Sequence, residues 1–276
     1  MLTDYHVHLR PDEAPSFAAD YFVPGNAERY RETAAERGVE ELGVSEHIHR
    51  FTAALDVWQH PFWRKSAVDD LDRYVGFVRE DTDLRLGIEA DYIRGTEDRM
   101  ANLLERHEWD YVLGSVHFLG EFAVDFDDET DIWRHESTPE RIWQRYFEAI
   151  AESALTGLYD VITHPDLVKI WGSGRPAPSR DPRFYYEPAI EAILEAGVAM
   201  EVSTAGLRKP VGEIYPARGM LEMAVDAGIP IALSSDAHRP EHLAFGYEEA
   251  VKLLTDCGVT EIAVFEKRTR RMEPLG

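Results

Sequence analysis

The sequence predicts an α/β barrel formed by one domain over residues 1–276. Strand and helix patterns alternate seven times along the chain, which is typical of a parallel sheet built from βαβ units. No linker or change of composition interrupts this alternation, and α/β barrels of this length commonly form a single domain. Reactive side chains stand where the strands end, and in a barrel such positions converge at one mouth. In an open doubly wound sheet, the competing architecture, they would be spread along a crevice.

The first expected strand covers residues 2–9, where polar and apolar residues alternate. Because residues two apart in a strand share a face, His6 and His8 point the same way and Val7 points to the opposite side. Two imidazoles placed in this way are a ready pair of ligands for a transition metal.

The later strands repeat this arrangement, because most of them also end at a histidine or an acidic residue. The residues at these ends are His47, Glu89, His117, His164 and Asp236, after expected strands over 42–45, 84–88, 111–116, 159–163 and 229–234. Further strands are expected over 198–202 and 261–265, and helices over 27–37, 68–79, 139–154 and 188–196, with Asn26 as the first N-cap. Residues 48–68 form a long aromatic excursion, and connections of this length are usually functional.

Each of these side chains has a structural explanation when it is taken alone. His164 precedes a proline and is able to shape a turn, and Asp236 is able to cap a helix. Their joint occurrence at successive strand ends is what predicts a metal centre. Nitrogen and oxygen ligands of this kind suit Zn, Mn or Fe. Glu89 among histidines is suited to bridging two ions, and paired ions can clamp the attacking and leaving oxygens of a displacement at phosphorus.

Six short motifs follow one another along the chain: Asp4-Tyr5-His6-Val7-His8, Ser45-Glu46-His47, Gly87-Ile88-Glu89, Ser115-Val116-His117, His164-Pro165-Asp166 and Ser235-Asp236-Ala237-His238. In this order they resemble the motifs of the PHP (polymerase and histidinol phosphatase) superfamily, over nearly the whole chain. The resemblance implies a distorted, TIM-like (β/α)7 barrel with two or three divalent metal ions.

Three further stretches are similar to the monofunctional histidinol-phosphatase branch of that superfamily: residues 116–119, 164–169 and 203–210, the last followed by Tyr215-Pro216. Members of this branch hydrolyse L-histidinol phosphate in histidine biosynthesis, so the resemblance implies a phosphoric monoester hydrolase with a small phosphorylated substrate. Two alternatives stay open: a phosphoesterase for another small ester, and a non-catalytic metal-binding barrel, which would have no open coordination position.

The same resemblance implies a ligand set. One metal would be held by His6, His8, Glu89 and Asp236, a second by Glu89, His117 and His164, and a third by His47 and His238. Relatives usually have another histidine shortly after the first motif, but residues 10–22 contain none. Asp12 or Glu13 replaces it, or His49 or His60 does, or the third ion is weak or absent and His47 and His238 are free for proton transfer. We expect a third ion with an unorthodox ligand.

Substrate contacts are expected from cations and aromatic residues near the strand ends. Lys169, Arg208 and Lys209 are candidates for binding the phosphate and for taking up charge on its oxygens, although each is also explained as a surface cation. His238 and a metal-bound water are the alternative candidates for donating a proton to the leaving alkoxide. Phe118, residues 58–63, which include His60, and the surrounding carboxylates are candidates for contacting the imidazole and amino groups, with plain packing as the alternative for the aromatic residues.

Composition narrows the class of partner. The formal net charge of -23 argues against a nucleic-acid surface, which needs clustered positive charge. Bound divalent cations would reverse the local sign for a phosphorylated substrate. The mean hydropathy of -0.36 and the lack of a long apolar run predict no membrane span. With no visible secretory signal and a single cysteine, Cys257, we expect a cytoplasmic protein, and we predict no particular oligomeric state.

Overall fold

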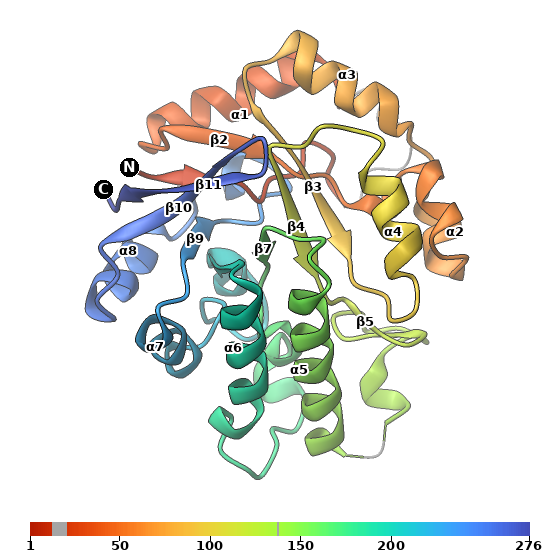
Figure 1. The fold of residues 1–276 in the computed structure, drawn as a ribbon, viewed down its shortest axis with the longest axis vertical. Helices are drawn as coiled ribbons and strands as arrows, with labels where there is room; N and C mark the ends of the chain where they lie inside the picture. Colours follow the sequence, from red (N-terminus) through yellow and green to blue (C-terminus); the bar gives the residue numbers. More distant parts are fainter. Residues whose placement is uncertain (13–20, 137) are drawn as a thin grey trace.

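The computed structural model describes residues 1–12, 21–136 and 138–276, and its centre is a parallel sheet that curls into a nearly closed barrel (Figure 1). The sheet has seven strands in the order β1 (Thr3–Asp4), β2 (Glu41–Val44), β3 (Arg85–Asp91), β4 (Tyr111–Ser115), β7 (Val161–Ile162), β8 (Ala199–Ser203) and β9 (Ile231–Ser234). Its two ends approach each other beyond β1 and β9, where the His8 N–H donates to the Ala237 carbonyl at 2.7 Å and the Ala237 N–H to the His6 carbonyl at 3.0 Å. The predicted barrel is confirmed.

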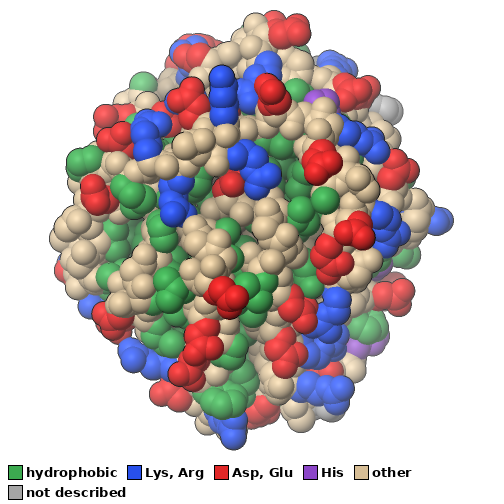
Figure 2. Space-filling view, in the orientation of Figure 1, with side chains coloured by type: hydrophobic (Ala, Val, Ile, Leu, Met, Phe, Trp, Pro, Cys, Tyr) green, Lys and Arg blue, Asp and Glu red, His purple; other side chains and the backbone are tan. Residues whose placement is uncertain are grey.

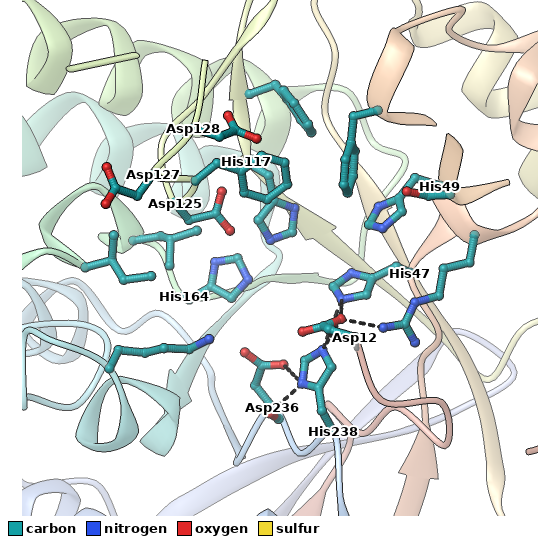
Figure 3. A pocket seen from close by; sticks show the side chains of 18 of the residues that line it. Asp12, His47, His49, His117, Asp125, Asp127, Asp128, His164, Asp236 and His238 are labelled. Atoms are coloured by element: carbon teal, nitrogen blue, oxygen red, sulfur yellow. Dashed lines mark hydrogen bonds and ion pairs between the residues drawn. The ribbon is translucent and has the colours of Figure 1, made fainter. Parts of the chain in front are cut away.

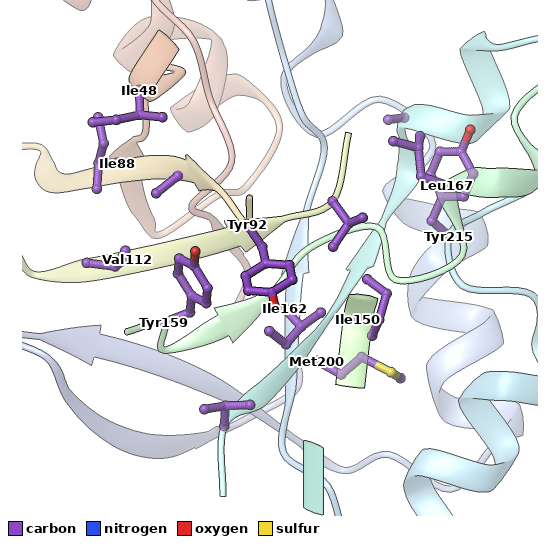
Figure 4. Close-up of a cluster of buried hydrophobic side chains, with 14 of the residues drawn as sticks. Ile48, Ile88, Tyr92, Val112, Ile150, Tyr159, Ile162, Leu167, Met200 and Tyr215 are labelled. Atoms are coloured by element: carbon purple, nitrogen blue, oxygen red, sulfur yellow. The ribbon is translucent and has the colours of Figure 1, made fainter. Parts of the chain in front are cut away.

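The strands read as nearly continuous apolar runs because both of their faces are buried. Inside the barrel, Tyr111 packs on Tyr5 with a ring separation of 4.9 Å. Gly43 on β2 and Gly87 on β3 make room for the Tyr111 ring, since a Cβ at either position would collide with it. On the outer faces the strands pack against the helices, where Val112, Ile162 and Met200 lie in one cluster with Ile150 (Figure 4).

Eight helices of the described residues surround the sheet: α1 (Pro24–Glu36), α2 (Pro61–Ser66), α3 (Leu71–Asp81), α4 (Glu97–Leu104), α5 (Pro139–Leu155), α6 (Arg183–Ala196), α7 (Arg218–Ala227) and α8 (Tyr247–Asp256). The prediction that Asn26 caps the first helix is wrong. Val23 precedes α1, and the Asn26 side chain donates instead to the carbonyls of Leu9 and Tyr21. Likewise α3 begins later than expected, because Asp70 accepts hydrogen bonds from the backbone of its first turn.

Two hairpins stand apart from the barrel sheet. At its floor, where the strands begin, β10 (Glu261–Glu266) pairs antiparallel with β11 (Thr269–Pro274), so the strand expected near residue 261 exists but does not extend the barrel. Phe265 from this hairpin packs against Tyr5 at a ring separation of 6.0 Å. At the mouth, where the strands end, β5 (Phe118–Leu119) pairs with β6 (Phe122–Ala123) directly after β4.

The aromatic excursion over residues 48–68 is mostly helical rather than a plain loop. It contains two short 3₁₀ helices, Ile48–Arg50 and Thr52–Asp56, and then α2. On the molecular face of Figure 2, acidic and basic side chains are interspersed. Among the helices that the structure describes, none is both long and apolar enough to cross a membrane.

Candidate metal centre

The side chains at the strand ends meet at the mouth of the barrel, around a cavity of about 750 Å³ (Figure 3). His6, His8 and Glu89 lie deepest and are almost fully buried. The cavity itself is lined by the remaining predicted ligands, namely His47, His117, His164, Asp236 and His238. Every residue of the predicted ligand set is therefore in one place, although the residues belong to six different strands or the segments that follow them.

Glu89 occupies the centre of this arrangement, with its two oxygens turned toward different histidines. Its Oε2 lies 3.3 Å from the Nε2 of His6 and 3.5 Å from the Nε2 of His8. Its Oε1 lies 3.3 Å from the Nε2 of His164 and 3.5 Å from the Nε2 of His117. A carboxylate placed in this way is able to bridge two cations, one for each pair of imidazoles.

Asp236 adds a second carboxylate to the side of His6 and His8. Its Oδ1 lies 3.5 Å from the Nε2 of His6 and 3.4 Å from the Nε2 of His8. Several buried atoms that face this point have no hydrogen-bond partner among the described residues: the Nε2 atoms of His6 and His8, Glu89 Oε2 and Asp236 Oδ1. Because buried polar atoms without partners are costly, a cation that accepts their lone pairs fits the site.

Two carboxylates that were not predicted from the sequence accept hydrogen bonds from the Nδ1 atoms of the candidate metal ligands. Glu201, in the middle of β8, accepts from the Nδ1 of His6 at 2.8 Å and from the backbone N–H of His164 at 2.6 Å. Asp91 accepts from the Nδ1 of His117 at 2.6 Å. Such partners fix the ring orientation and leave Nε2 free to bind a metal. The sequence contains an indication of both residues. Asp91 lies two residues after Glu89, on the same strand face, and Glu201 interrupts an apolar run.

The carboxylates and histidines at the centre shift one another's pKa values toward the charged forms. Burial by itself raises the pKa of Glu89, but the charges of His47, His6 and His117 outweigh burial and hold this pKa well below its usual value. Burial lowers the pKa of His6, but the opposing charges of Glu89 and two other carboxylates raise it well above the usual value. A bound divalent cation would supply the positive charge that protonated histidines would otherwise supply beside these carboxylates.

A third position lies between His47, His238 and Asp12. The Nε2 atoms of the two histidines are 3.2 Å apart. The Oδ1 of Asp12 lies 3.3 Å from the Nε2 of His238 and 3.9 Å from the Nε2 of His47. The Nη2 of Arg50 holds the same oxygen at 2.6 Å. Among the open alternatives, the geometry thus favours Asp12 as the substitute for the absent histidine. Glu13, the other acidic candidate, lies outside the described residues.

Comparison with known proteins gives this arrangement a family. Residues 24–205 match the PHP domain. A relative from Deinococcus radiodurans, named "probable histidinol-phosphatase", is 33% identical over 258 residues, covering 91% of this chain and 93% of its own. This chain belongs to the PHP domain family. A histidinol-phosphatase from Bacillus subtilis is 28% identical, with 80% of this chain and 90% of its own covered.

A solved structure supports the PHP fold. Histidinol phosphate phosphatase from Lactococcus lactis, in complex with zinc, L-histidinol and phosphate, superposes with a TM-score of 0.71 at 18% sequence identity. The superposition covers 98% of each chain. The predicted membership of the PHP superfamily is confirmed by these comparisons.

Three predicted substrate contacts do not reach the cavity of this PHP barrel. The ammonium group of Lys169 is held by Asp166 at 3.0 Å and also contacts Glu213 and the Ile214 carbonyl. Arg208 donates to the carbonyls of Ser235 and Asp236 at 2.8 and 2.9 Å, so it holds the loop that carries Asp236. Both were expected to bind phosphate. The ammonium of Lys169 and the Nη2 of Arg208 have partners within the protein instead, whereas the Nη1 of Arg208 is buried without a partner among the described residues.

His60 is the third, and the structure corrects both roles considered for it. Its Nδ1 accepts from the Phe62 N–H at the start of α2, its Nε2 lies 3.2 Å from the Glu121 carbonyl, and its ring stacks on Trp58 at 4.3 Å. Neither nitrogen is available for a metal or a substrate. By contrast, Lys209, Phe118 and Phe62, all of them among the predicted contacts, line the cavity. Phe126, which was not predicted, lines it as well. His49 also lines it, with its Nδ1 3.5 Å from Asp91.

Proposed function

We propose that this chain is a metal-dependent phosphomonoesterase that hydrolyses L-histidinol phosphate to L-histidinol and phosphate. The observation that carries the proposal is Glu89, whose Oε2 faces His6, His8 and His47 and whose Oε1 faces His117 and His164, beside a cavity large enough for a small ester. The names of the relatives from Deinococcus radiodurans and Bacillus subtilis support the choice of ester. We also propose that residues 1–276 act as one domain and work in the cytoplasm.

We assign one cation to His6, His8 and Asp236 and a second to His117 and His164, with Glu89 shared between them. We assign a third to Asp12, His47 and His238. Imidazole and carboxylate donors suit Zn, Mn or Fe. When bound, such ions supply Lewis acidity and a water that ionises near neutral pH.

The chain's own residues would bind and orient the ester around these ions. Lys209, one of the two lysines that line the cavity with Lys65, is the predicted candidate for the phosphate oxygens. The guanidinium groups of Arg10 and Arg50 also line the cavity, but they already pair with Asp69 and Asp12. Phe118 offers an apolar surface to the organic part of the ester.

His238 has one of two roles in this proposal, as a ligand of the third cation or as the proton donor to the leaving alkoxide. Burial lowers the pKa of His238, but Asp12 and Asp236 outweigh burial and raise it above the usual value. Without a third ion, the raised pKa favours the protonated ring, which is able to donate a proton.

The test is phosphate release by the full chain reconstituted with Zn, Mn or Fe, using L-histidinol phosphate, a sugar phosphate, a nucleoside monophosphate and a generic aryl phosphate. We expect the highest kcat/KM for L-histidinol phosphate, and loss of all release after chelation of the metal. A higher kcat/KM for another ester would identify a phosphoesterase of different specificity. No release from any ester by metal-loaded protein would indicate a non-catalytic barrel.

A further inference from the structure

One wall of the cavity is acidic, and the sequence analysis did not single it out. It consists of Asp125, Asp127 and Asp128, which follow the β5–β6 hairpin and all line the cavity. In Figure 3, Asp125 lies next to His164 and His117, and the other two lie farther from Asp236 and His238.

The three carboxylates differ in whether they already have partners. Asp127 pairs with Arg134 at 3.0 Å and with Arg175 at 2.9 Å. Asp128 accepts from the backbone N–H and the hydroxyl of Thr130 at 2.7 and 2.6 Å. The Oδ1 of Asp125 is buried and has no partner in the described part of the chain. Of this wall, Asp125 thus offers an acceptor that a ligand can satisfy.

The backbone fixes Asp125 beside the metal ligands. The N–H of its neighbour Val124 donates to the carbonyl of His117 at 2.9 Å, and the indole N–H of Trp171 donates to the Val124 carbonyl, also at 2.9 Å. The carboxylate is therefore held close to His117, and a site built on such supports orients a ligand with little loss of entropy.

Three phenylalanines stand beside this carboxylate. Phe62 meets Phe126 edge to face at 4.7 Å, and Phe118 lies 6.0 Å from Phe62 and 5.9 Å from Phe126. All three line the cavity, so they form an aromatic surface that suits a flat heterocycle.

We propose that Asp125 determines substrate specificity by accepting a hydrogen bond from the primary ammonium group of the ester, with the heterocycle packed on the three phenylalanines. This inference rests on the proposed function. In L-histidinol phosphate the ammonium is on the carbon next to the phosphorylated carbon, and the imidazole is one carbon farther away. The cavity presents matching groups in the same order. The metal ligands would face the phosphate, Asp125 would face the ammonium, and the aromatic surface beside Asp125 would face the imidazole. An ammonium would satisfy a buried oxygen that otherwise has no partner.

The experiment compares Asp125→Asn with Glu129→Gln, a matched control that alters an exposed carboxylate of the same segment that does not line the cavity. Each metal-loaded protein is assayed with L-histidinol phosphate and with its des-amino analogue, 3-(imidazol-4-yl)propyl phosphate. We expect Asp125→Asn to lower kcat/KM for the amino ester by about 10- to 100-fold, the range for hydrogen bonds to charged groups. The des-amino ester should change by less than about threefold, and the control should resemble wild type with both.

A second readout does not depend on turnover. Calorimetric titration of the metal-loaded proteins with L-histidinol should show the same selective loss of affinity in Asp125→Asn, with an unchanged metal content. Equal losses for both esters, or a loss of metal, would place Asp125 in the metal centre and overturn the inference. No loss with either ester would also overturn it.

The wild-type protein separates this inference from the proposed function. If wild type prefers an ester other than L-histidinol phosphate, the proposed function fails. The role of Asp125 is then tested with the preferred ester and its amino or des-amino counterpart. It is overturned if wild type treats the two members of that pair alike, and supported if Asp125→Asn abolishes a preference for the amino member.

Discussion

The two ends of the barrel differ in how their buried polar groups are satisfied. At the floor, Asp110 accepts from the backbone N–H groups of Leu86 at 2.9 Å and Lys267 at 3.2 Å, and it pairs with Arg79 at 2.7 Å. The Tyr111 hydroxyl donates to the Tyr5 carbonyl at 2.7 Å. At the mouth, buried nitrogens and oxygens of the histidine and carboxylate cluster face one another without such partners.

This difference indicates that the floor contributes mainly to the stability of the fold and the mouth mainly to ligand binding and catalysis. Satisfied polar groups and close aromatic packing at the floor stabilise the protein by itself, whereas the cluster at the mouth is completed only by ligands that bind the folded state. In natural proteins, buried polar groups that lack hydrogen-bond partners within the chain occur mainly at functional sites. Changes at the mouth should therefore remove metal or activity and leave the fold, and changes at the floor should do the reverse.

The largest effect is expected at the mouth, from Glu89→Gln. A neutral amide is a poor ligand and cannot balance two dications, so we expect the loss of at least one metal equivalent and a fall in kcat of at least about a thousandfold, since metal-ion catalysis is worth several kcal/mol. Elemental analysis and phosphate release measure the two losses. Glu195→Gln, which alters an exposed carboxylate of α6, is the control. A Glu89→Gln protein with full metal content and activity would show that Glu89 is not a bridge.

The comparison also explains which parts of the structure the sequence predicted. The strands and the residues at their ends were predictable because alternation and apolar runs are local patterns, and parallel strands bring their carboxyl ends together. The roles of Lys169 and Arg208 were not, since a position after a strand does not decide whether a side chain turns toward the cavity or toward a nearby carbonyl. Glu201 and Asp125 depend on neighbours that are far away in sequence or on a hairpin that folds back.

The floor gives the second prediction, Phe265→Ala. Its ring is 1% exposed and packs inside the barrel, so truncation should lower the free energy of unfolding by about 3–5 kcal/mol, the usual range for a buried phenylalanine. Urea denaturation measures the change. Phe184→Ala is the matched control, because this ring is 51% exposed, and it should cost no more than about 0.5 kcal/mol. A loss of metal from the folded Phe265→Ala protein would contradict the separation of the two ends.

The third prediction returns to the mouth and concerns Asp12→Asn. If Asp12 completes the third position, the variant should bind one metal equivalent about 10- to 100-fold more weakly and keep the bridged pair, as expected when one of few ligands is weakened. Metal titration followed by calorimetry separates the classes of site. His60→Ala is the control, since both of its ring nitrogens have other partners, and its metal content should not change. Loss of an equivalent in His60→Ala but not in Asp12→Asn would reverse the assignment.

The smallest effect is expected from Asp110→Asn at the floor, and it has a defined dependence on pH. Burial by itself raises the pKa of Asp110, but the donors from Leu86, Arg79 and Lys267 outweigh burial and keep this pKa below its usual value. A carboxyl with a lower pKa in the folded than in the unfolded state stabilises the fold above its unfolded pKa, which is about 3.9, and this stabilisation disappears as the pH falls through the folded pKa.

We therefore expect Asp110→Asn to lower the free energy of unfolding by about 1 kcal/mol at pH 7, because the amide keeps only part of the hydrogen bonding and Arg79 is partly exposed. The difference from wild type should shrink as the pH is lowered below about 4. Urea denaturation at both pH values measures it, with Asp226→Asn, an exposed position of α7, as the control that should show the same small offset at each pH. A difference that grows on acidification would mean that Asp110 is held protonated in the folded state, and the floor would then share the unsatisfied charge of the mouth.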